Sequence, residues 1–129
     1  MAELLFTLEL RGKAGPTGSD PSRLHATTSG KGPKGENVAF ESDVALSDGT
    51  FEEHGTIRYG SRGQVKFETV GAGHIGPSPV ADIMAGAVVW TVTEGDGEFN
   101  GEKGYITSNF TVSKDGDVVD NHYARIYLT

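Results

Sequence analysis

The chain has 129 residues, contains no cysteine and carries a formal net charge of −7 at pH 7. This length suits one domain with a single core, and the lack of cysteine excludes disulfides and thiolate metal sites. The acidic balance, without a visible basic stripe, argues against nucleic acid and anionic membranes as partners.

The first half of the chain shows mainly two-residue periodicity, which predicts half-buried strands. Residues 4–10 alternate in this way and lack the features of a secretion signal, so we expect a cytoplasmic protein. Residues 12–36 are rich in Gly, Ser, Pro and Lys, and we expect a long flexible loop or lid there. The alternation returns over residues 37–46, and the sequence SDGT at 47–50 is typical of a tight hairpin turn.

The second half of the chain continues the same pattern. Further alternating segments begin near residues 51, 65, 88, 105 and 117, and a second Asp-Gly turn precedes the last of them. We expect helix only over residues 77–87, about two turns with Ser78 as the cap and Pro79 as the first residue. The whole pattern predicts an antiparallel meander of seven or eight strands.

A meander of this length has two exposed edges unless it closes on itself. We therefore predict a single all-β domain over residues 1–129, a small closed antiparallel β-barrel of about eight strands. A barrel of this size is either filled by side chains or hollow enough for one small ligand. A sandwich is the alternative, although Greek-key sandwiches need longer crossovers than these turns provide.

A glycine pattern at residues 71–76 matches G-x-G-x-x-G, which is typical of dinucleotide-binding folds. A chain with 19 glycines gives such matches by chance, and residues 30–35 match as well. Two prolines stand where the required helix would begin, and the following segment is too short for a parallel crossover. We interpret this segment as a rim loop and expect no cofactor.

A second glycine-rich turn, G-x-G-x-F-x-G-x-x-G, lies between two predicted strands, and its defining positions are Gly95, Gly97, Phe99, Gly101 and Gly104. Together with the segments YITSNFTV and VVDNHYARIYL, it resembles the C-terminal part of the allene oxide cyclase-like barrels, which include dirigent proteins and uncharacterised bacterial families. The resemblance covers the last quarter of the chain and implies a barrel whose end is plugged by the phenylalanine. Members of the group cyclise or isomerise small apolar molecules or direct a coupling reaction, and many are dimers or trimers. The resemblance assigns no catalytic residue here.

Several polar residues fall on strand faces that otherwise carry apolar side chains. Asp120 and His122 do so in the last strand, and Glu53 does so earlier, provided that no bulge at Gly55 shifts the register. A desolvated Glu, or a buried His beside a carboxylate, has a perturbed pKa that suits proton transfer. We therefore expect His122 or Glu53 to be the catalytic group, with Asp120 beside the histidine and Tyr59 polarising the substrate.

Aromatic side chains are the candidate substrate contacts. We expect Trp90, Phe40, Phe67 and Phe110 to face the lumen and His74 to reach over its mouth from the glycine loop. Ordinary structural roles are the alternative: hydrogen bonds at the mouth, a solvated glutamate, core aromatic residues and an exposed loop histidine.

Two further features complete the prediction. The four histidines form no close pair, so we expect no metal site. The outer face of the last strand predicts a homo-oligomer interface, dimeric or trimeric, through Asn121, Tyr123, Arg125 and Tyr127.

The sequence leaves three hypotheses open: a cofactor-independent isomerase or cyclase acting on a small apolar or aromatic metabolite, a non-catalytic binding or directing protein with the same cavity, and a filled barrel that acts through its surface.

Overall fold

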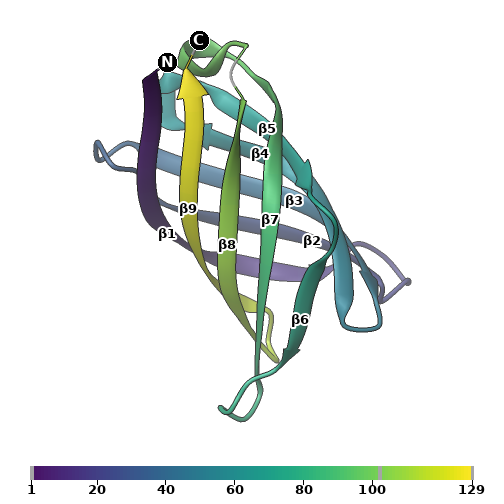
Figure 1. The fold of residues 1–129 in the computed structure, drawn as a ribbon. Coiled ribbons are helices and arrows are strands. Elements are labelled where there is room, and N and C mark those ends of the chain that lie inside the picture. Colours follow the sequence, from purple (N-terminus) through teal and green to yellow (C-terminus); the bar gives the residue numbers. More distant parts are fainter. Residues whose placement is uncertain (1, 102, 129) are drawn as a thin grey trace.

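A computed structural model describes residues 2–101 and 103–128, which form nine β-strands and two short 3-10 turns (Figure 1). The strands are β1 (Ala2–Pro16), β2 (Arg23–Lys31), β3 (Asn37–Ser47), β4 (Thr50–Tyr59), β5 (Gln64–Thr69), β6 (Gly73–Pro77), β7 (Ile83–Gly95), β8 (Lys103–Ser113) and β9 (Asp117–Leu128). The 3-10 turns are η1 (Gly60–Arg62) and η2 (Gly97–Phe99). None of the described residues belongs to a helix long and apolar enough to cross a membrane.

The strands close into an eight-stranded antiparallel barrel with one extra strand, which confirms the predicted fold class. Each strand of the barrel pairs with its neighbours in the chain, and closure comes from the long pairing of β1 with β9, which runs from Ala2↔Leu128 to Lys13↔Asp117. The extra strand, β6, pairs with both β4 and β7 beyond the end of β5. Closure removes the exposed edges of the meander, so the sandwich alternative is excluded.

The prediction of a loop over residues 12–36 is wrong. β1 continues to Pro16 and β2 occupies Arg23–Lys31, and the two pair from Arg11↔Ser29 to Pro16↔Leu24. The inward positions here are small or polar side chains such as Ala26 and Thr28, which give little hydrophobic alternation. The hairpin is stabilised by its ladder and its place in the closed barrel, neither of which is visible in local composition.

The prediction of a helix over residues 77–87 is also wrong. β6 ends at Pro77, a turn follows, and β7 begins at Ile83. Ser78 does act as a cap, because its Oγ accepts a hydrogen bond from the Val80 N–H at 3.1 Å, but the motif that it caps is a hairpin turn. The turn residue Asp82 has φ 63°, a left-handed conformation that Asp tolerates.

The predicted hairpin at residues 47–50 is confirmed. Asp48 and Gly49 have φ values of 55° and 87°, the two positive angles that a type I′ turn requires. The register of β3 and β4 then runs without a shift from Ser47↔Thr50 to Val38↔Tyr59. The strand that carries Glu53 therefore has no bulge at Gly55 against β3, and the alternation predicted for it holds.

One end of the barrel is filled. Phe99, from η2, is completely buried and packs against Tyr59 with ring centroids 5.3 Å apart, as the plug predicted from the glycine turn. Arg62 lies over the Phe99 ring at 5.5 Å and forms ion pairs with Glu36 at 3.0 Å and Glu98 at 2.9 Å. These contacts fill this end of the barrel, and the cavity described below lies toward the opposite end.

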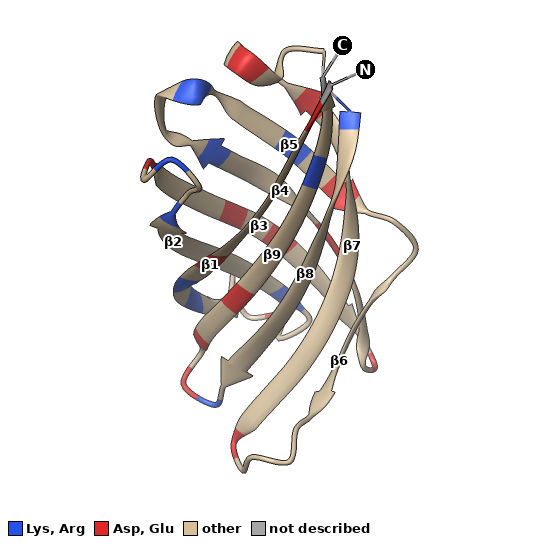
Figure 2. Ribbon diagram, turned by 60° about the vertical axis from the view of Figure 1, so that its left-hand side comes forward, with Lys and Arg blue, Asp and Glu red and all other residues tan. Residues whose placement is uncertain are grey.

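Charged residues are dispersed along the strands and turns rather than gathered into a basic stripe (Figure 2). The sheet formed by β6, β7 and β8 carries few charges apart from those at its turns.

Candidate functional site

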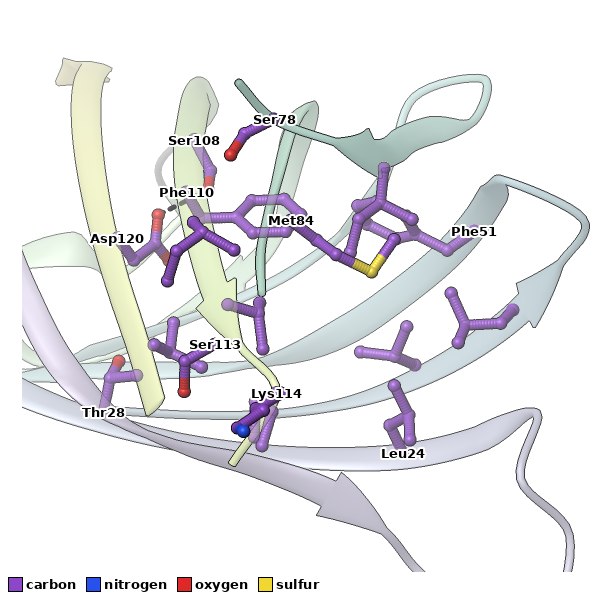
Figure 3. Close-up of a pocket in the computed structure, with 18 of the residues that line it drawn as sticks. Leu24, Thr28, Phe51, Ser78, Met84, Ser108, Phe110, Ser113, Lys114 and Asp120 are labelled. Carbon is purple, nitrogen blue, oxygen red and sulfur yellow. Dashed lines mark hydrogen bonds between the residues drawn. The ribbon is translucent and has the colours of Figure 1, made fainter. Parts of the chain in front are cut away.

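The end of the barrel opposite Phe99 contains a cavity of about 590 Å³, a volume within the range of small-molecule sites (Figure 3). Its walls are mainly aliphatic and aromatic, and they include Leu24, Leu46, Phe51, Met84, Phe110 and Val118. The β6–β7 turn and the β8–β9 turn form its mouth, where Asp82 and Lys114 lie.

Two glycines make room for the aromatic wall. The Phe51 ring covers Gly73 on β6, and the Phe110 ring covers Gly86 on β7, so that a side chain at either glycine would overlap a ring. The two rings meet edge to face with centroids 5.7 Å apart. Gly73 belongs to the G-x-G-x-x-G pattern, and its role here is to accommodate an aromatic ring within an antiparallel strand.

Glu53 is the first polar group of the cavity. It lies on β4, points inward and is 9% exposed. Ser42 Oγ donates a hydrogen bond to one carboxyl oxygen at 2.5 Å, and Trp90 Nε1 donates to the other at 3.2 Å. Gly55 permits this arrangement, because a Cβ there would overlap the Glu41 carbonyl oxygen and the Cα of Ser42.

Burial raises the pKa of Glu53 from 4.5 to about 7. The hydrogen bond from Ser42 opposes this shift, the negative charge of Asp120 reinforces it, and the hydrogen bond from Trp90 opposes it. Near neutral pH both protonation states of the carboxyl group are therefore populated. A group of this kind can donate or accept a proton with little cost in either direction.

Asp120 is the second carboxyl group that lines the cavity. Ser108 Oγ donates to one of its oxygens at 2.5 Å, and His122 Nε2 lies 2.9 Å from the other. When Asp120 is ionised, the Nε2–H form of His122 donates to it, which leaves Nδ1 buried without a partner among the described residues. The imidazole packs edge-on against Phe40 and Trp90, with ring centroids 5.6 Å and 5.1 Å away.

The two carboxyl groups belong to one connected cluster. Trp90 joins its halves, since its indole donates to Glu53 and packs against His122, the partner of Asp120. Thr28 also lines the cavity, and its Oγ1 is buried without a partner in the described part of the chain. We call the four cavity-lining residues at this depth the polar floor: Thr28, Glu53, Ser108 and Asp120, each 1–9% exposed.

The structure brings together most of the predicted site residues. Glu53, Asp120, Trp90, Phe40 and Phe110 line the cavity. The other two inward-facing residues are buried behind this lining: His122 contacts Asp120 and Trp90, and Phe67 stacks on Phe40 at 5.4 Å and contacts Trp90 at 4.4 Å. His122 contacts Asp120 and can orient it, but His122 does not line the cavity.

Tyr59 and His74 lie elsewhere. Tyr59 is in the filled end against Phe99, where burial raises the pKa of its hydroxyl far above the usual range. That hydroxyl does not line the cavity, so its position gives no support to the prediction that it polarises a substrate. His74 is exposed on β6 and is not part of the lining, because its strand position directs the side chain outward.

Three polar residues of the cluster were missed in the sequence. Ser42 stands between inward-facing Phe40 and Val44, and Ser108 stands between Ile106 and Phe110, so two-residue alternation places both inside. They escaped notice because serine itself gives no hydrophobic signal. Thr28 lies in the segment that was expected to be a loop.

The polar floor offers side-chain groups for binding and for proton transfer. Within residues 2–101 and 103–128, no group of three or more His, Asp or Glu side chains is placed to hold a metal ion. Glu53 can exchange a proton near neutral pH, and Asp120 is held in place by two hydrogen-bonding partners. The arrangement is suited to binding a mostly apolar molecule with one polar group at depth, and to moving one proton there.

Comparison of the chain with protein-family models, with curated proteins and with solved structures finds no match. The fold class is therefore shown by the structure itself, a closed eight-stranded antiparallel β-barrel with one extra strand.

Proposed function

We propose that the cavity binds a small apolar or aromatic molecule and that Glu53 exchanges a proton with it, so that the protein is a cofactor-independent isomerase or cyclase. The observation that carries the proposal is the buried carboxyl group of Glu53 on the polar floor of a cavity with mainly apolar walls, and burial raises the pKa of this group to about 7. The apolar walls select one conformer of the ligand, and the carboxyl group supplies or removes the proton.

The resemblance of residues 94–129 to the allene oxide cyclase-like barrels supports this proposal. Members of that group act on small apolar molecules, and the plug formed by Phe99 agrees with the barrel that the resemblance implies. We propose that the chain is a divergent member of that superfamily, whose active group would be Glu53.

A non-catalytic binding or directing protein is the second candidate. The hydrogen bonds that Ser42 and Trp90 donate to Glu53 favour it, because they also give this carboxyl group a purely structural role. Glu53→Gln separates the two candidates once a substrate is known. At a saturating concentration of the ligand, the variant is expected to abolish turnover in an enzyme and to leave the action of a directing protein intact.

Trp90 provides a direct test of binding. It is the only tryptophan and it lines the cavity, so its fluorescence reports occupancy. We expect 3-phenylpropan-1-ol to change this fluorescence saturably and to raise the melting temperature. Ala26→Phe places a ring inside the cavity and is expected to abolish the change, whereas Ala87→Phe, on an exposed position of β7, is the matched control. A wild type that responds to no apolar or aromatic probe of this size, or an equal response in Ala26→Phe, would refute the proposal.

We also propose that the protein is a homo-oligomer. Leu5 and Tyr105 are 50% and 53% exposed on the outer face, and both flank Arg125 across β1, β9 and β8. Exposed Tyr123 extends this patch along β9. Light scattering is expected to show a dimer or trimer that Tyr123→Glu dissociates, and a monomeric wild type would exclude this arrangement.

A further inference from the structure

The polar floor contains two carboxyl groups, those of Glu53 and Asp120, and no basic side chain. The donors nearest its carboxyl groups, Ser42 and Trp90 for Glu53 and Ser108 for Asp120, are already used. In the described part of the chain, no Lys or Arg lies within 4.0 Å of either carboxyl group, and His122 is the only basic side chain in contact with one. Desolvated carboxyl groups without a full counter-charge are costly, so a cationic partner would stabilise them.

Thr28 gives an independent sign of a missing partner. Thr28 lines the cavity, and the residue is 5% exposed. Its Oγ1 atom is buried and has no hydrogen-bond partner among the described residues. Figure 3 shows Thr28, Asp120 and Ser108 on one side of the cavity, with Phe51 and Leu24 on the other. A buried hydroxyl normally has a hydrogen-bond partner, and a ligand in the cavity can supply one.

We infer that the ligand is a hydrophobic amine, whose protonated nitrogen lies on the polar floor near Asp120 and Glu53 and whose aromatic or aliphatic part fills the cavity. The inference rests on the proposed function and names its ligand class. An ammonium group has N–H donors and no acceptor, which matches two carboxyl groups and a free hydroxyl oxygen. A carboxylate ligand would instead meet like charge in a desolvated site.

The surroundings of the floor favour a cation as well. The rings of Phe40 and Trp90, whose centroids are 5.5 Å apart, both line the cavity, and aromatic rings attract nearby positive charge. The net charge of −7 attracts cations toward the protein at long range. At the mouth, Lys114 is accompanied by Asp82, so the charge there is balanced.

Three probes with one skeleton test the inference: 3-phenylpropan-1-amine, 3-phenylpropan-1-ol and 3-phenylpropanoate. In Trp90 fluorescence titrations at pH 8, the amine is expected to bind at least about tenfold more tightly than the alcohol, and the carboxylate more weakly than both. If the alcohol binds as tightly as the amine, the inference is wrong and the proposed function stands. If none of the three binds, the proposed function itself falls.

Variants of the floor provide the second arm. Asp120→Asn and Glu53→Gln are each expected to weaken binding of the amine by about tenfold while changing binding of the alcohol by less than about threefold. Glu52→Gln is the matched control, because Glu52 is the exposed neighbour of Glu53 and points away from the cavity. Equal losses for the amine and the alcohol would show that the carboxyl groups only shape the site, and would overturn the inference. The wild-type probe series decides the matter even if a floor variant fails to fold.

The pH dependence of binding gives a third readout. Glu53 is affected by the charge of Asp120 from β9 and accepts hydrogen bonds from Ser42 of β3 and Trp90 of β7. His122, also on β9, contacts Asp120 and Trp90. Because the amine binds the ionised carboxylate, its affinity is expected to rise with pH up to about 7, by at most about tenfold for each pH unit. Glu53→Gln is expected to flatten this rise. A wild-type affinity that is flat or falls between pH 5.5 and 7.5 would contradict the inference.

Discussion

Replacing Glu53 by Gln is expected to stabilise the protein at alkaline pH. The raised pKa means that the native state binds a proton on Glu53 more tightly than the unfolded chain does. The stability linked to this proton is therefore fully present below pH 4.5 and is lost as the pH rises through about 7. The difference between the pKa values of 4.5 and about 7 corresponds to about 3 kcal/mol in the free energy of unfolding.

Gln reproduces the neutral carboxyl group without its charge. Its carbonyl oxygen can accept from Trp90, and its NH₂ group can donate to Ser42 once that hydroxyl rotates. Urea denaturation between pH 4 and pH 9 measures the free energy of unfolding of the wild type and of Glu53→Gln. The contributions of the other titrating groups largely cancel in the difference between the two proteins at each pH. We expect the variant to gain stability relative to the wild type as the pH rises, reaching about 3 kcal/mol above pH 8. A difference that does not change with pH would show that Glu53 is not desolvated.

Three further substitutions test the packing. Tyr59→Phe removes a buried hydroxyl that has no hydrogen-bond partner among the described residues. Urea denaturation is therefore expected to show unchanged stability or a gain of about 1 kcal/mol. A loss above about 1 kcal/mol would mean that the hydroxyl forms a hydrogen bond. Gly55→Ala forces a methyl group against the Glu41 carbonyl oxygen and is expected to lower the free energy of unfolding by about 1–3 kcal/mol. Gly15→Ala is the control and is expected to change it very little, because a Cβ there meets no neighbour within 4 Å. Equal effects of the two variants would contradict the register of β3 and β4. Phe99→Ala empties the plug and is expected to cost about 3–5 kcal/mol in the same assay, and a loss below about 1 kcal/mol would show that this end is open.

The barrel could be predicted because most of its strands bury one face. Strand β4 illustrates this, since Phe51, Glu53, Ile57 and Tyr59 are all buried, and the alternation placed a glutamate among them. The same reasoning identified Asp120 and His122 on β9. Inward-facing carboxyl groups were thus visible from the sequence before their neighbours were known.

The missed elements have small or polar side chains at inward positions. Ala14 and Ala26 in the β1–β2 hairpin, and Gly86 in the first half of β7, carry too little apolar surface to mark a face. These small residues leave the space that Phe110 and the cavity occupy, so the features that hid the strands also create the site. The approach of Glu53 to Asp120 could not be predicted, because it depends on how the barrel closes across strands far apart in the sequence.

A carbon-13 NMR titration of the Glu53 side-chain carboxyl, in the free protein and with 3-phenylpropan-1-ol added, tests the central claim most directly. If the claim holds, we expect a pKa of about 7 in the free protein and a saturable change in this resonance as the ligand enters the cavity. A carboxyl group that titrates near its ordinary value of 4.5, or a resonance that the ligand does not affect, would contradict it.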